Sequence, residues 1–284
     1  MEFGSGVFHS IDRYQFQNAK WPDCEGKLHF GLPQWSVKEW RSQIYPSDAK
    51  DSEFLSLYSE LFSCVEVSSS FYASVPPERF ESWGKQVGEN FRFLPKWPKA
   101  LTHDRLLQNG ELIQTSFLES LEALGPKLGA SLVQLPPVFS REYARQLYYF
   151  LLSLPSFLPL CLEFRHPSWF EKGRLYSKLE AYLEAHHIGM ALSDTPTGSN
   201  VFHLSFPSSP VLIRYLSDEN LETDKTRLNL WRDFLTNHNN KLGDVFFVLH
   251  RSENIRVPEL IEFISPELSA EIIQRNQKSQ RELF

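Results

Sequence analysis

The fold of this chain is decided by two similar stretches, CVEVSSSFY (residues 64–72) and LCLEFRHPSW (residues 160–169). Each is a short run of apolar and β-branched residues that carries one glutamate near its end, Glu66 in the first and Glu163 in the second. Polar, cationic or aromatic residues follow at once. In a barrel of parallel strands, this pattern marks a strand that passes from the packed interior to the functional rim. We therefore expect a parallel sheet whose strands present polar side chains at one end.

Strand-like and helix-like segments alternate along the rest of the chain. Counting parts of the two stretches above, eight runs have the apolar character of strands buried on both faces: KLHFGL (27–32), CVEVSS (64–69), NFRFLPK (90–96), ASLVQL (130–135), LCLEFR (160–165), IGMALSD (188–194), PVLIRYL (210–216) and DVFFVLH (244–250). Segments with helical period lie between and after them, at 52–62, 76–87, 116–129, 140–154, 177–187, 225–240, 258–264 and 266–276. This alternation predicts an α/β protein with a single (β/α)₈ barrel, the TIM-barrel fold.

An open, doubly wound sheet is the alternative fold. Such a sheet places a Gly-rich turn after its first strand. Here GLPQW (31–35) occupies that position, with one glycine and no GxGxxG motif, so the closed barrel is the better prediction. We divide the chain into an N-terminal extension at 1–27, which has no clear period, and a barrel domain at 28–284. Long rim loops are expected at 110–117 and 195–210.

Charge and cysteine content narrow the class of protein. The net charge of −6 and the pI near 5.9 argue against a general nucleic-acid coat, because phosphate contacts need a basic surface. The cysteines, Cys24, Cys64 and Cys161, have no CxxC spacing, so we expect free thiols, as in a reducing cytoplasm. No apolar run approaches the ~20 residues that span a bilayer, and no signal peptide is recognisable. A cytoplasmic location without a membrane partner is therefore expected.

Six sequence blocks resemble, in order, the signature blocks of the YecE-like family. They are WRSQIYP (40–46), FSCVEVSSSFY (62–72), FRFLPKWPKALTH (91–103), KLGASLVQLPP (127–137), LEFRHPSWF (162–170) and ALSDTP (191–196). This family is a group of bacterial and archaeal proteins that carry a domain of unknown function with a TIM-barrel fold. The resemblance covers residues 28–265 and implies that fold. It implies no activity, because the family has none assigned.

The chain departs from the family pattern at the expected rim. GLPQW (31–35) stands where the family has a Gly-Thr-Ser-Gly-Trp-like turn, and IRYLS (213–217) replaces an Arg-Leu-His-Gly-like end of the seventh strand. LHRSEN (249–254) replaces an Asn-rich end of the eighth strand. Ligand contacts of other family members therefore need not transfer to this chain.

Polar residues at the C-terminal ends of the strands are the candidates for a site, because active sites of TIM barrels lie there. The candidate catalytic residues are Glu66 and Glu163. The candidate ligand-binding residues are Tyr72, Lys96, His103, Gln134, Arg165, His166, Trp169, Asp194, Arg214 and His250. A charged side chain directed into a barrel is costly unless it is paired or serves a ligand. The structural alternative to a functional site is therefore a set of ion pairs that stabilise the barrel.

Three chemistries fit this set of residues. The first depends on the two glutamates and the second depends on the cations. Cleavage of a glycosidic bond by Glu66 and Glu163 would need one carboxyl with a raised pKa and one that stays ionised. The walls of such a site would be aromatic, formed by Phe71, Tyr72, Trp97 and Trp169. The other chemistry acts on an anionic, for example phosphorylated, substrate. Its anion would be held by Lys96, Arg165 and Arg214, with a glutamate or His250 as the base.

A divalent metal is the third option, with Glu66, Glu163, Asp194 and a histidine as ligands. The nearby cations would repel it, and the chain has no HxH or HExxH spacing, so we expect neither a metal nor a cofactor. The prediction is thus a TIM-barrel protein that acts as a hydrolase-type enzyme on an anionic or sugar-containing small molecule. The alternative is a non-catalytic protein that binds an anionic ligand in the same pocket or, less favoured, a nucleic-acid segment.

Overall fold

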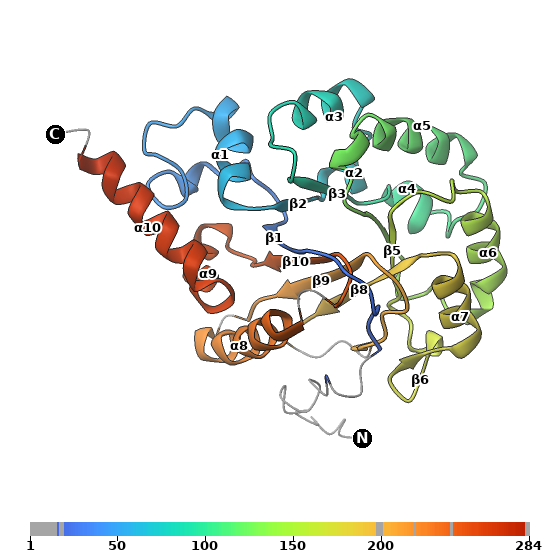
Figure 1. The fold of residues 1–284 in the computed structure, drawn as a ribbon. Coiled ribbons are helices and arrows are strands. Elements are labelled where there is room, and N and C mark those ends of the chain that lie inside the picture. The colour runs from blue at the N-terminus through green and yellow to red at the C-terminus, as the bar shows by residue number, and fades with distance from the viewer. Residues whose placement is uncertain (1–15, 17–19, 197–200, 219, 239–240, 282–284) are drawn as a thin grey trace, which may run out of the picture.

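The computed structural model describes residues 16, 20–196, 201–218, 220–238 and 241–281 of the chain. Eight parallel strands form one sheet in the order β3, β2, β1, β10, β9, β8, β5, β4. Their bounds are β1 (Leu28–Leu32), β2 (Cys64–Val67), β3 (Arg92–Pro95), β4 (Ser131–Gln134), β5 (Leu160–Glu163), β8 (Gly189–Asp194), β9 (Val211–Leu216) and β10 (Val245–His250). The sheet curls into a nearly closed barrel with helices around it (Figure 1). All eight predicted strands and the TIM-barrel class are confirmed.

The seam of the barrel lies between β3 and β4. Two isolated parallel bridges join these strands, Phe93 with Leu128 and Lys96 with Leu132. The N–H of Trp97 also donates to the carbonyl oxygen of Leu132 at 2.9 Å. The seam is thus joined by isolated bridges rather than by a continuous ladder, and Lys96 forms one of them.

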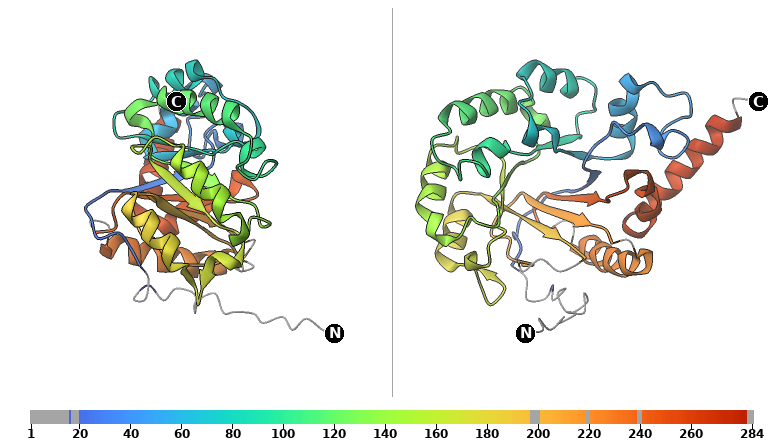
Figure 2. Two further views of the ribbon diagram at one scale, coloured as in Figure 1. Left: turned by 90° about the vertical axis from the view of Figure 1, so that its right-hand side faces the viewer. Right: turned by 180° about the vertical axis from the view of Figure 1, so that it is seen from behind.

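Helices connect the strands and cover the outside of the barrel (Figures 1 and 2). In the described part of the chain the α-helices are α1 (Phe54–Leu61), α2 (Ser69–Tyr72), α3 (Pro77–Gly84), α4 (Lys99–Thr102), α5 (Glu111–Glu122), α6 (Ala144–Leu152), α7 (Ser177–Ala185), α8 (Leu221–His238), α9 (Pro258–Ile264) and α10 (Pro266–Arg281). Short 3₁₀ turns are found at Lys38–Trp40, Asp51–Glu53, Gly125–Lys127, Arg141–Tyr143, Pro167–Trp169 and Asn254–Arg256. Figure 2 shows that α10 extends away from the barrel, and none of the described helices is long and apolar enough to cross a membrane.

Two helices begin earlier than their apolar pattern indicates. The prediction of a rim loop at 110–117 was wrong, because these residues lead into and form the first half of α5, whose buried Phe117 and Leu121 share one face four residues apart. Helix α8 begins four residues before its predicted start. The Oδ1 atom of Asn220 accepts the N–H groups of Glu222 at 3.0 Å and Thr223 at 3.3 Å, which caps this helix.

A two-stranded hairpin after β5 has no counterpart in the sequence prediction. Its strands are β6 (Phe170–Glu171) and β7 (Arg174–Leu175), which pair antiparallel. Lys172 and Gly173 form the turn with φ angles of 52° and 78°. Positive φ at both central residues is the geometry of a tight hairpin turn, and a glycine at the second position favours it.

Alternation along the strands fills the barrel with apolar side chains and makes one end polar. The apolar interior consists of Cys64, Leu94, Ala130, Leu132, Cys161, Ala191, Leu212, Phe246 and Val248. A side chain two positions further along a strand points to the same face. The residues two positions after seven of these nine are Glu66, Lys96, Gln134, Glu163, Ser193, Arg214 and His250. The C-terminal end of the barrel interior is therefore polar, as TIM-barrel sites require.

The larger part of the apolar core lies between the sheet and the helices, where outward-facing residues such as Val65, Leu162 and Phe247 are buried. Of the predicted N-terminal extension, residues 1–15 and 17–19 lie outside the described residues, as do residues 197–200 of the predicted loop at 195–210. Trp21 stacks on Phe206, with ring centroids 4.5 Å apart, so the described end of the extension packs on the connection between β8 and β9.

Candidate functional site

Four charged side chains from four strands meet at the polar end of the barrel. Glu66 lies on β2, Lys96 follows β3, Glu163 ends β5, and Arg214 lies on β9. All four are buried. The sequence predicted that these residues share one end of the barrel, and the structure brings them together there.

Arg214 connects the two glutamates. Its Nε donates to Oε2 of Glu66 at 2.7 Å, and its Nη2 donates to Oε1 of the same carboxylate at 3.0 Å. Its Nη1 lies 3.5 Å from Oε2 of Glu163. The fork geometry of the guanidinium matches a carboxylate, so the contact with Glu66 is a strong, charge-assisted pair.

Glu163 accepts further hydrogen bonds from its other neighbours. Gln134 Nε2 donates to Oε2 at 2.7 Å, and Arg165 Nε donates to Oε1 at 2.9 Å. Ser193 Oγ also donates to Oε1 at 2.9 Å, and the same hydroxyl accepts from Arg214 Nη1 at 3.0 Å. The carboxylate is therefore surrounded by donors, which fix its position.

Glu66 has two smaller neighbours in addition to the arginine. Ser68 Oγ donates to Oε1 at 2.8 Å, and His250 Nε2 lies 3.4 Å from Oε2 without making a well-aligned hydrogen bond. Ser68 directly follows β2 and precedes α2, so the turn between these two elements brings its hydroxyl back to Glu66.

The arginine keeps both carboxylates ionised. Burial alone would raise the pKa of Glu66, but attraction to Arg214 and His250 holds it well below its usual range. Burial is likewise outweighed at Glu163, where Arg214, Arg165 and the hydrogen bond from Gln134 lower the pKa to about 2. Burial would lower the pKa of Arg214, but the two carboxylates raise it.

The pKa shifts of the two glutamates bear on the prediction of glycosidic cleavage. That mechanism needs one carboxyl group that is protonated near neutral pH, hence one with a raised pKa. Both glutamates here have lowered pKa values, and both are buried against Arg214. The geometry therefore supports glutamates that orient cations better than a pair that transfers a proton to a sugar oxygen.

Lys96 lies in the same cluster but is not paired with either glutamate. Its Nζ sits 3.8 Å from the centre of the Phe71 ring, and among the described residues no carboxylate oxygen lies within 4 Å of it. Burial comes first among the causes that lower the pKa of Lys96 to about 8, followed by repulsion from Arg214. The two glutamates act in the opposite direction. A buried ammonium without a counter-ion is costly, so this group is a candidate for ligand contact.

Arg165 and His103 extend the cationic side of the cluster. The Arg165 side chain is 37 % exposed and uses its Nε for Glu163, while its two Nη atoms make no hydrogen bond within the described part of the chain. Burial and then the charges of Lys96 and Arg165 lower the pKa of His103 to about 4. Its ring is therefore neutral at pH 7, and it packs edge-on against Phe71 with ring centroids 5.0 Å apart.

Asp194, a predicted ligand-binding residue, does not join the cluster. It points to the outer face of β8, where Oδ1 lies 3.0 Å from Nη2 of the buried Arg227 and Oδ2 accepts from Trp231 Nε1 at 2.9 Å. Its neighbour Ser193 faces the interior instead. The sequence prediction was one residue off in register, and such a shift turns a side chain to the opposite face. Counting two positions on from Ala191 would have found Ser193.

Three further predicted residues lie away from the charged cluster. Trp169 is buried and donates from Nε1 to the carbonyl oxygen of Phe139 at 2.7 Å, so its ring does not line an open mouth. His166 Nδ1 accepts the N–H of Ser168 at 3.1 Å and caps a 3₁₀ turn. Tyr72 is 79 % exposed on α2. Trp97, expected as an aromatic wall, is buried against Phe117 and Phe150.

Metal ligands do not gather in the described part of the chain. No three His, Cys, Asp or Glu side chains there come together in a way that could bind a metal ion. Both glutamates that were considered as ligands are engaged by arginine, and Asp194 lies on another face. The donor set at the barrel end thus fits an anion better than a cation.

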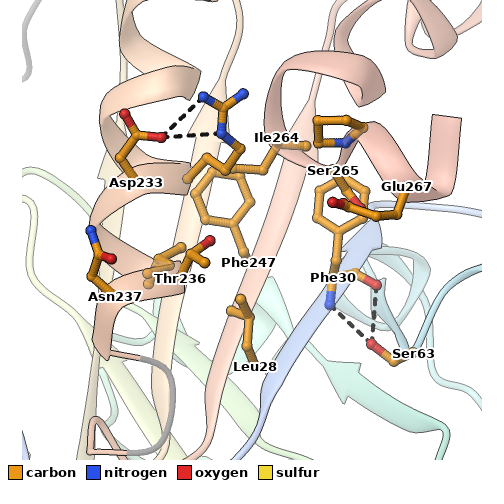
Figure 3. Close-up of a pocket in the computed structure, with 13 residues that line it drawn as sticks. Leu28, Phe30, Ser63, Asp233, Thr236, Asn237, Phe247, Ile264, Ser265 and Glu267 are labelled. Atoms are coloured by element: carbon orange, nitrogen blue, oxygen red, sulfur yellow. Dashed lines mark hydrogen bonds and ion pairs between the residues drawn. The ribbon is translucent and has the colours of Figure 1, made fainter.

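A cavity of about 620 Å³ lies outside the barrel rather than at its polar end (Figure 3). It is bounded by α8, by the junction of α9 and α10, and by outward-facing residues of β1 and β10. Some of its polar side chains pair with neighbours: Arg232 Nη2 donates to Asp233 at 3.0 Å, and Ser63 Oγ accepts the N–H of Phe30 at 3.0 Å. None of the predicted site residues lines this cavity.

Comparison with known proteins places the chain among relatives without an assigned activity. Residues 29–282 match the family model described as "Protein of unknown function DUF72". The UPF0759 protein YecE of Escherichia coli strain K12 is 27% identical over 256 residues, which cover 82% of this chain and 90% of that protein. The UPF0759 protein YunF of Bacillus subtilis strain 168 is 29% identical over 204 residues, covering 68% of this chain and 67% of that protein.

Two crystal structures share the fold. A DUF72 family protein of Enterococcus faecalis V583 superposes with a TM-score of 0.63 at 19% identity, covering 86% of this chain and 98% of that one. A DUF72 family protein of Thermotoga maritima MSB8 gives 0.62 at 20% identity, covering 87% and 99%. The resemblance to the YecE-like family is therefore confirmed. At this identity the structures speak for the fold alone.

Proposed function

Because the chain belongs to the DUF72 family, whose description states no function, we propose from its own side chains that the polar end of the barrel binds a small anionic molecule. Lys96 and Arg165 are the anchoring groups. One observation carries this proposal: every carboxylate in the cluster is engaged by arginine, while among the described residues the Lys96 ammonium has no carboxylate partner and the Nη atoms of Arg165 make no hydrogen bond.

The charge balance of the cluster supports an anion. Lys96, Arg165 and Arg214 are three cations that face two carboxylates, Glu66 and Glu163. A phosphate or carboxylate group would supply the missing negative charge and accept charge-assisted hydrogen bonds, of which the planar guanidinium of Arg165 can give two. In this arrangement Glu66 and Glu163 hold Arg214 and Arg165 in place.

The kind of ligand is a small molecule rather than nucleic acid. The excess of positive charge is confined to this one barrel end, whereas the chain as a whole carries a net charge of −6, which disfavours contacts along a phosphate backbone. All three cysteines are free thiols, which agrees with a reducing cytoplasm as the proposed location.

Titration with sulfate tests this proposal. We expect wild-type protein to bind sulfate, and the NMR chemical shifts of Lys96 and its neighbours to move on binding. The Lys96→Met and Arg165→Met variants should bind sulfate roughly 10-fold to 100-fold more weakly, which is the range for a lost hydrogen bond to a charged group. Lys85→Met is the matched control, because Lys85 is exposed on α3 and pairs with Glu81. Equal affinity in all four proteins would refute the proposal.

Hydrolysis of the bound anion is the second candidate function, and His250 favours it. Burial and then repulsion from Arg214 lower the pKa of His250 against the attraction of Glu66, so its ring is neutral near pH 7. Because Nε2 faces Glu66 Oε2 at 3.4 Å, the carboxylate favours the tautomer with the proton on that nitrogen. Nδ1 is then free to accept a proton from an attacking water.

A panel of phosphate and carboxylate esters, including 4-nitrophenyl phosphate, tests hydrolysis. We expect His250→Asn to lower kcat on any ester that is turned over by roughly 10²-fold to 10⁴-fold, the usual contribution of a general base. His186→Asn, at the exposed end of α7, should leave it unchanged. Turnover that survives in His250→Asn would remove this histidine from the mechanism.

A further inference from the structure

Lys96 differs from the other lysines in the described part of the chain. It alone is buried, whereas Lys20, Lys38, Lys85 and Lys99 form ion pairs with carboxylates at the surface. Lys96 keeps 8% of its surface exposed and makes no ion pair with a described carboxylate. A lysine held in this way has a function other than surface charge.

The Ser70 hydroxyl group helps to fix the backbone around Lys96. Ser70 Oγ accepts the Lys96 N–H at 3.1 Å and lies 2.7 Å from the carbonyl oxygen of Lys96 and 2.8 Å from that of Val67. Together with the Phe71 ring below the ammonium, Ser70 ties α2 to the end of β3. The lysine therefore projects from a rigid base, as a reacting group should.

The neighbours of Lys96 favour a neutral amine. Arg214 and Arg165 repel a proton on Nζ, and the carboxylates that would attract it are engaged with Arg214. Desolvation together with adjacent cations is the arrangement by which enzymes prepare a lysine amine for attack on a carbonyl group. A pKa of about 8 leaves a useful fraction of the amine unprotonated near neutral pH.

From this geometry we propose that Lys96 forms a reversible imine with an aldehyde or ketone whose carboxylate or phosphate group is held by Arg165. This inference rests on the proposed anion site and names the substrate class that the site serves. The anchoring guanidinium and the amine lie at the same end of the barrel, since Lys96 pairs with Leu132 of β4. Gln134 at the end of that strand donates to Glu163 at 2.7 Å, and Glu163 accepts from Arg165 at 2.9 Å. A small 2-oxo acid or a phosphorylated carbonyl compound carries both required groups.

The reaction is balanced without an oxidant or a reductant. The lone pair of Nζ forms a bond to the carbonyl carbon, the carbonyl oxygen takes up a proton, and the nitrogen releases one. The lone pair of the nitrogen then forms the C=N bond as the C–O bond breaks, the oxygen takes up a second proton and leaves as water, and the nitrogen gives up its remaining proton. The neutral imidazole of His103 contacts the same Phe71 ring as the Lys96 ammonium and is available to carry these protons.

Reductive trapping tests the proposal. The full chain is incubated at pH 7 with glyoxylate and sodium cyanoborohydride, which reduces an imine to a stable secondary amine, and the modified lysines are mapped by peptide mass spectrometry. We expect Lys96 to be labelled on the order of 10-fold to 100-fold faster than exposed Lys85, because its neutral fraction is larger. Lys96→Arg, with its fold checked by circular dichroism, should lose this fast label.

A neutral probe separates the anchor from the nucleophile. With formaldehyde as this probe under the same conditions, the ratio of glyoxylate labelling to formaldehyde labelling at Lys96 should fall at least tenfold in Arg165→Met, because only glyoxylate carries a carboxylate for the anchor, whereas a change in the amine itself alters both labelling rates alike. Sulfate should protect Lys96 against glyoxylate. If sulfate binds as proposed but Lys96 reacts no faster than Lys85, the imine is refuted and the anion site stands. If sulfate does not bind and glyoxylate labels Lys96 no faster than Lys85, both are refuted.

Discussion

Arg214 and Glu66, 148 residues apart in the sequence, form a bidentate pair inside the barrel, with Nε and Nη2 donating to the two carboxylate oxygens at 2.7 and 3.0 Å. The same guanidinium reaches Glu163 on its other side at 3.5 Å. One cation therefore engages both glutamates, and Lys96 is left without a carboxylate partner. The proposed anion site depends on this division of partners.

Glu66→Gln should destabilise the fold. Glutamine keeps the size of the side chain but removes the charge that compensates Arg214, and breaking a buried ion pair in this way costs about 3–5 kcal/mol. Urea unfolding followed by circular dichroism measures the loss. Glu81→Gln is the control, because the Glu81 pair with Lys85 is exposed and should be worth less than about 1 kcal/mol. A loss in Glu66→Gln no larger than in the control would contradict the pair's importance.

Glu163 should make stability fall in acid. Its pKa is about 2 in the folded protein against an ordinary value of 4.5, so the folded state binds this proton more weakly than the unfolded chain. The stabilisation, about 3 kcal/mol, is therefore fully present above about pH 4.5 and is lost as the pH falls toward about 2. The free energy of unfolding, measured across this range, should fall more steeply in wild type than in Glu163→Gln. Parallel curves for the two proteins would count against this contribution of Glu163 to stability.

The fold could be predicted because each strand carries its own signal. Eight apolar runs with polar ends give the barrel, and alternation within CVEV and LCLE places Glu66 and Glu163 on the inner face. The partner choice could not be predicted. Which of Lys96, Arg165 and Arg214 pairs with which glutamate depends on distances across the barrel, and the sequence contains no record of these distances.

Errors at the site came from residues whose orientation is set by tertiary packing. Trp169 follows a predicted site strand, yet its indole turns into the apolar layer, where it stacks on Phe139 and packs at a tilt against Phe164. A rim tryptophan and a core tryptophan have the same local sequence pattern. No sequence pattern indicated the cavity beside α8 for a similar reason, since its walls combine Leu28, Phe30 and Ser63 with α8 and the junction of α9 and α10, which come about 170 residues or more later in the chain.

Ser193→Ala should weaken the site although no motif marks this serine. Its hydroxyl donates to Glu163 at 2.9 Å and accepts from Arg214 at 3.0 Å, so its removal leaves two buried charged groups with one partner fewer. We expect a loss of about 1–3 kcal/mol in the free energy of unfolding. Ser59→Ala, which removes a surface hydroxyl from α1, should change it by less than about 0.5 kcal/mol. Equal losses in the two variants would argue against the network.

Sulfate affinity should depend on the protonation of Lys96. The ammonium attracts the anion and the neutral amine does not, and burial and repulsion from Arg214 bring the pKa to about 8. Affinity measured by calorimetry should therefore fall about tenfold between about pH 7 and pH 9, a range in which the charge of sulfate is constant. The Lys96→Met variant should show no such fall. The same pH dependence in both proteins would assign the titration to another group.

Asp194→Asn separates the fold from the site, because Asp194 is adjacent to Ser193 but faces the opposite way. Its carboxylate pairs with buried Arg227 at 3.0 Å between β8 and α8. Asparagine can still accept from Trp231, but it leaves the charge of Arg227 less well compensated, so we expect a loss of about 3–5 kcal/mol in the free energy of unfolding. Sulfate affinity, measured where both proteins are folded, should equal that of wild type.

Ser193→Ala should instead weaken sulfate binding, because it loosens Arg214 and Glu163 beside the anchors. If Asp194→Asn lowered sulfate affinity as much as Ser193→Ala does, the inner and outer faces of β8 would not be independent, and the site would extend into the α8 interface.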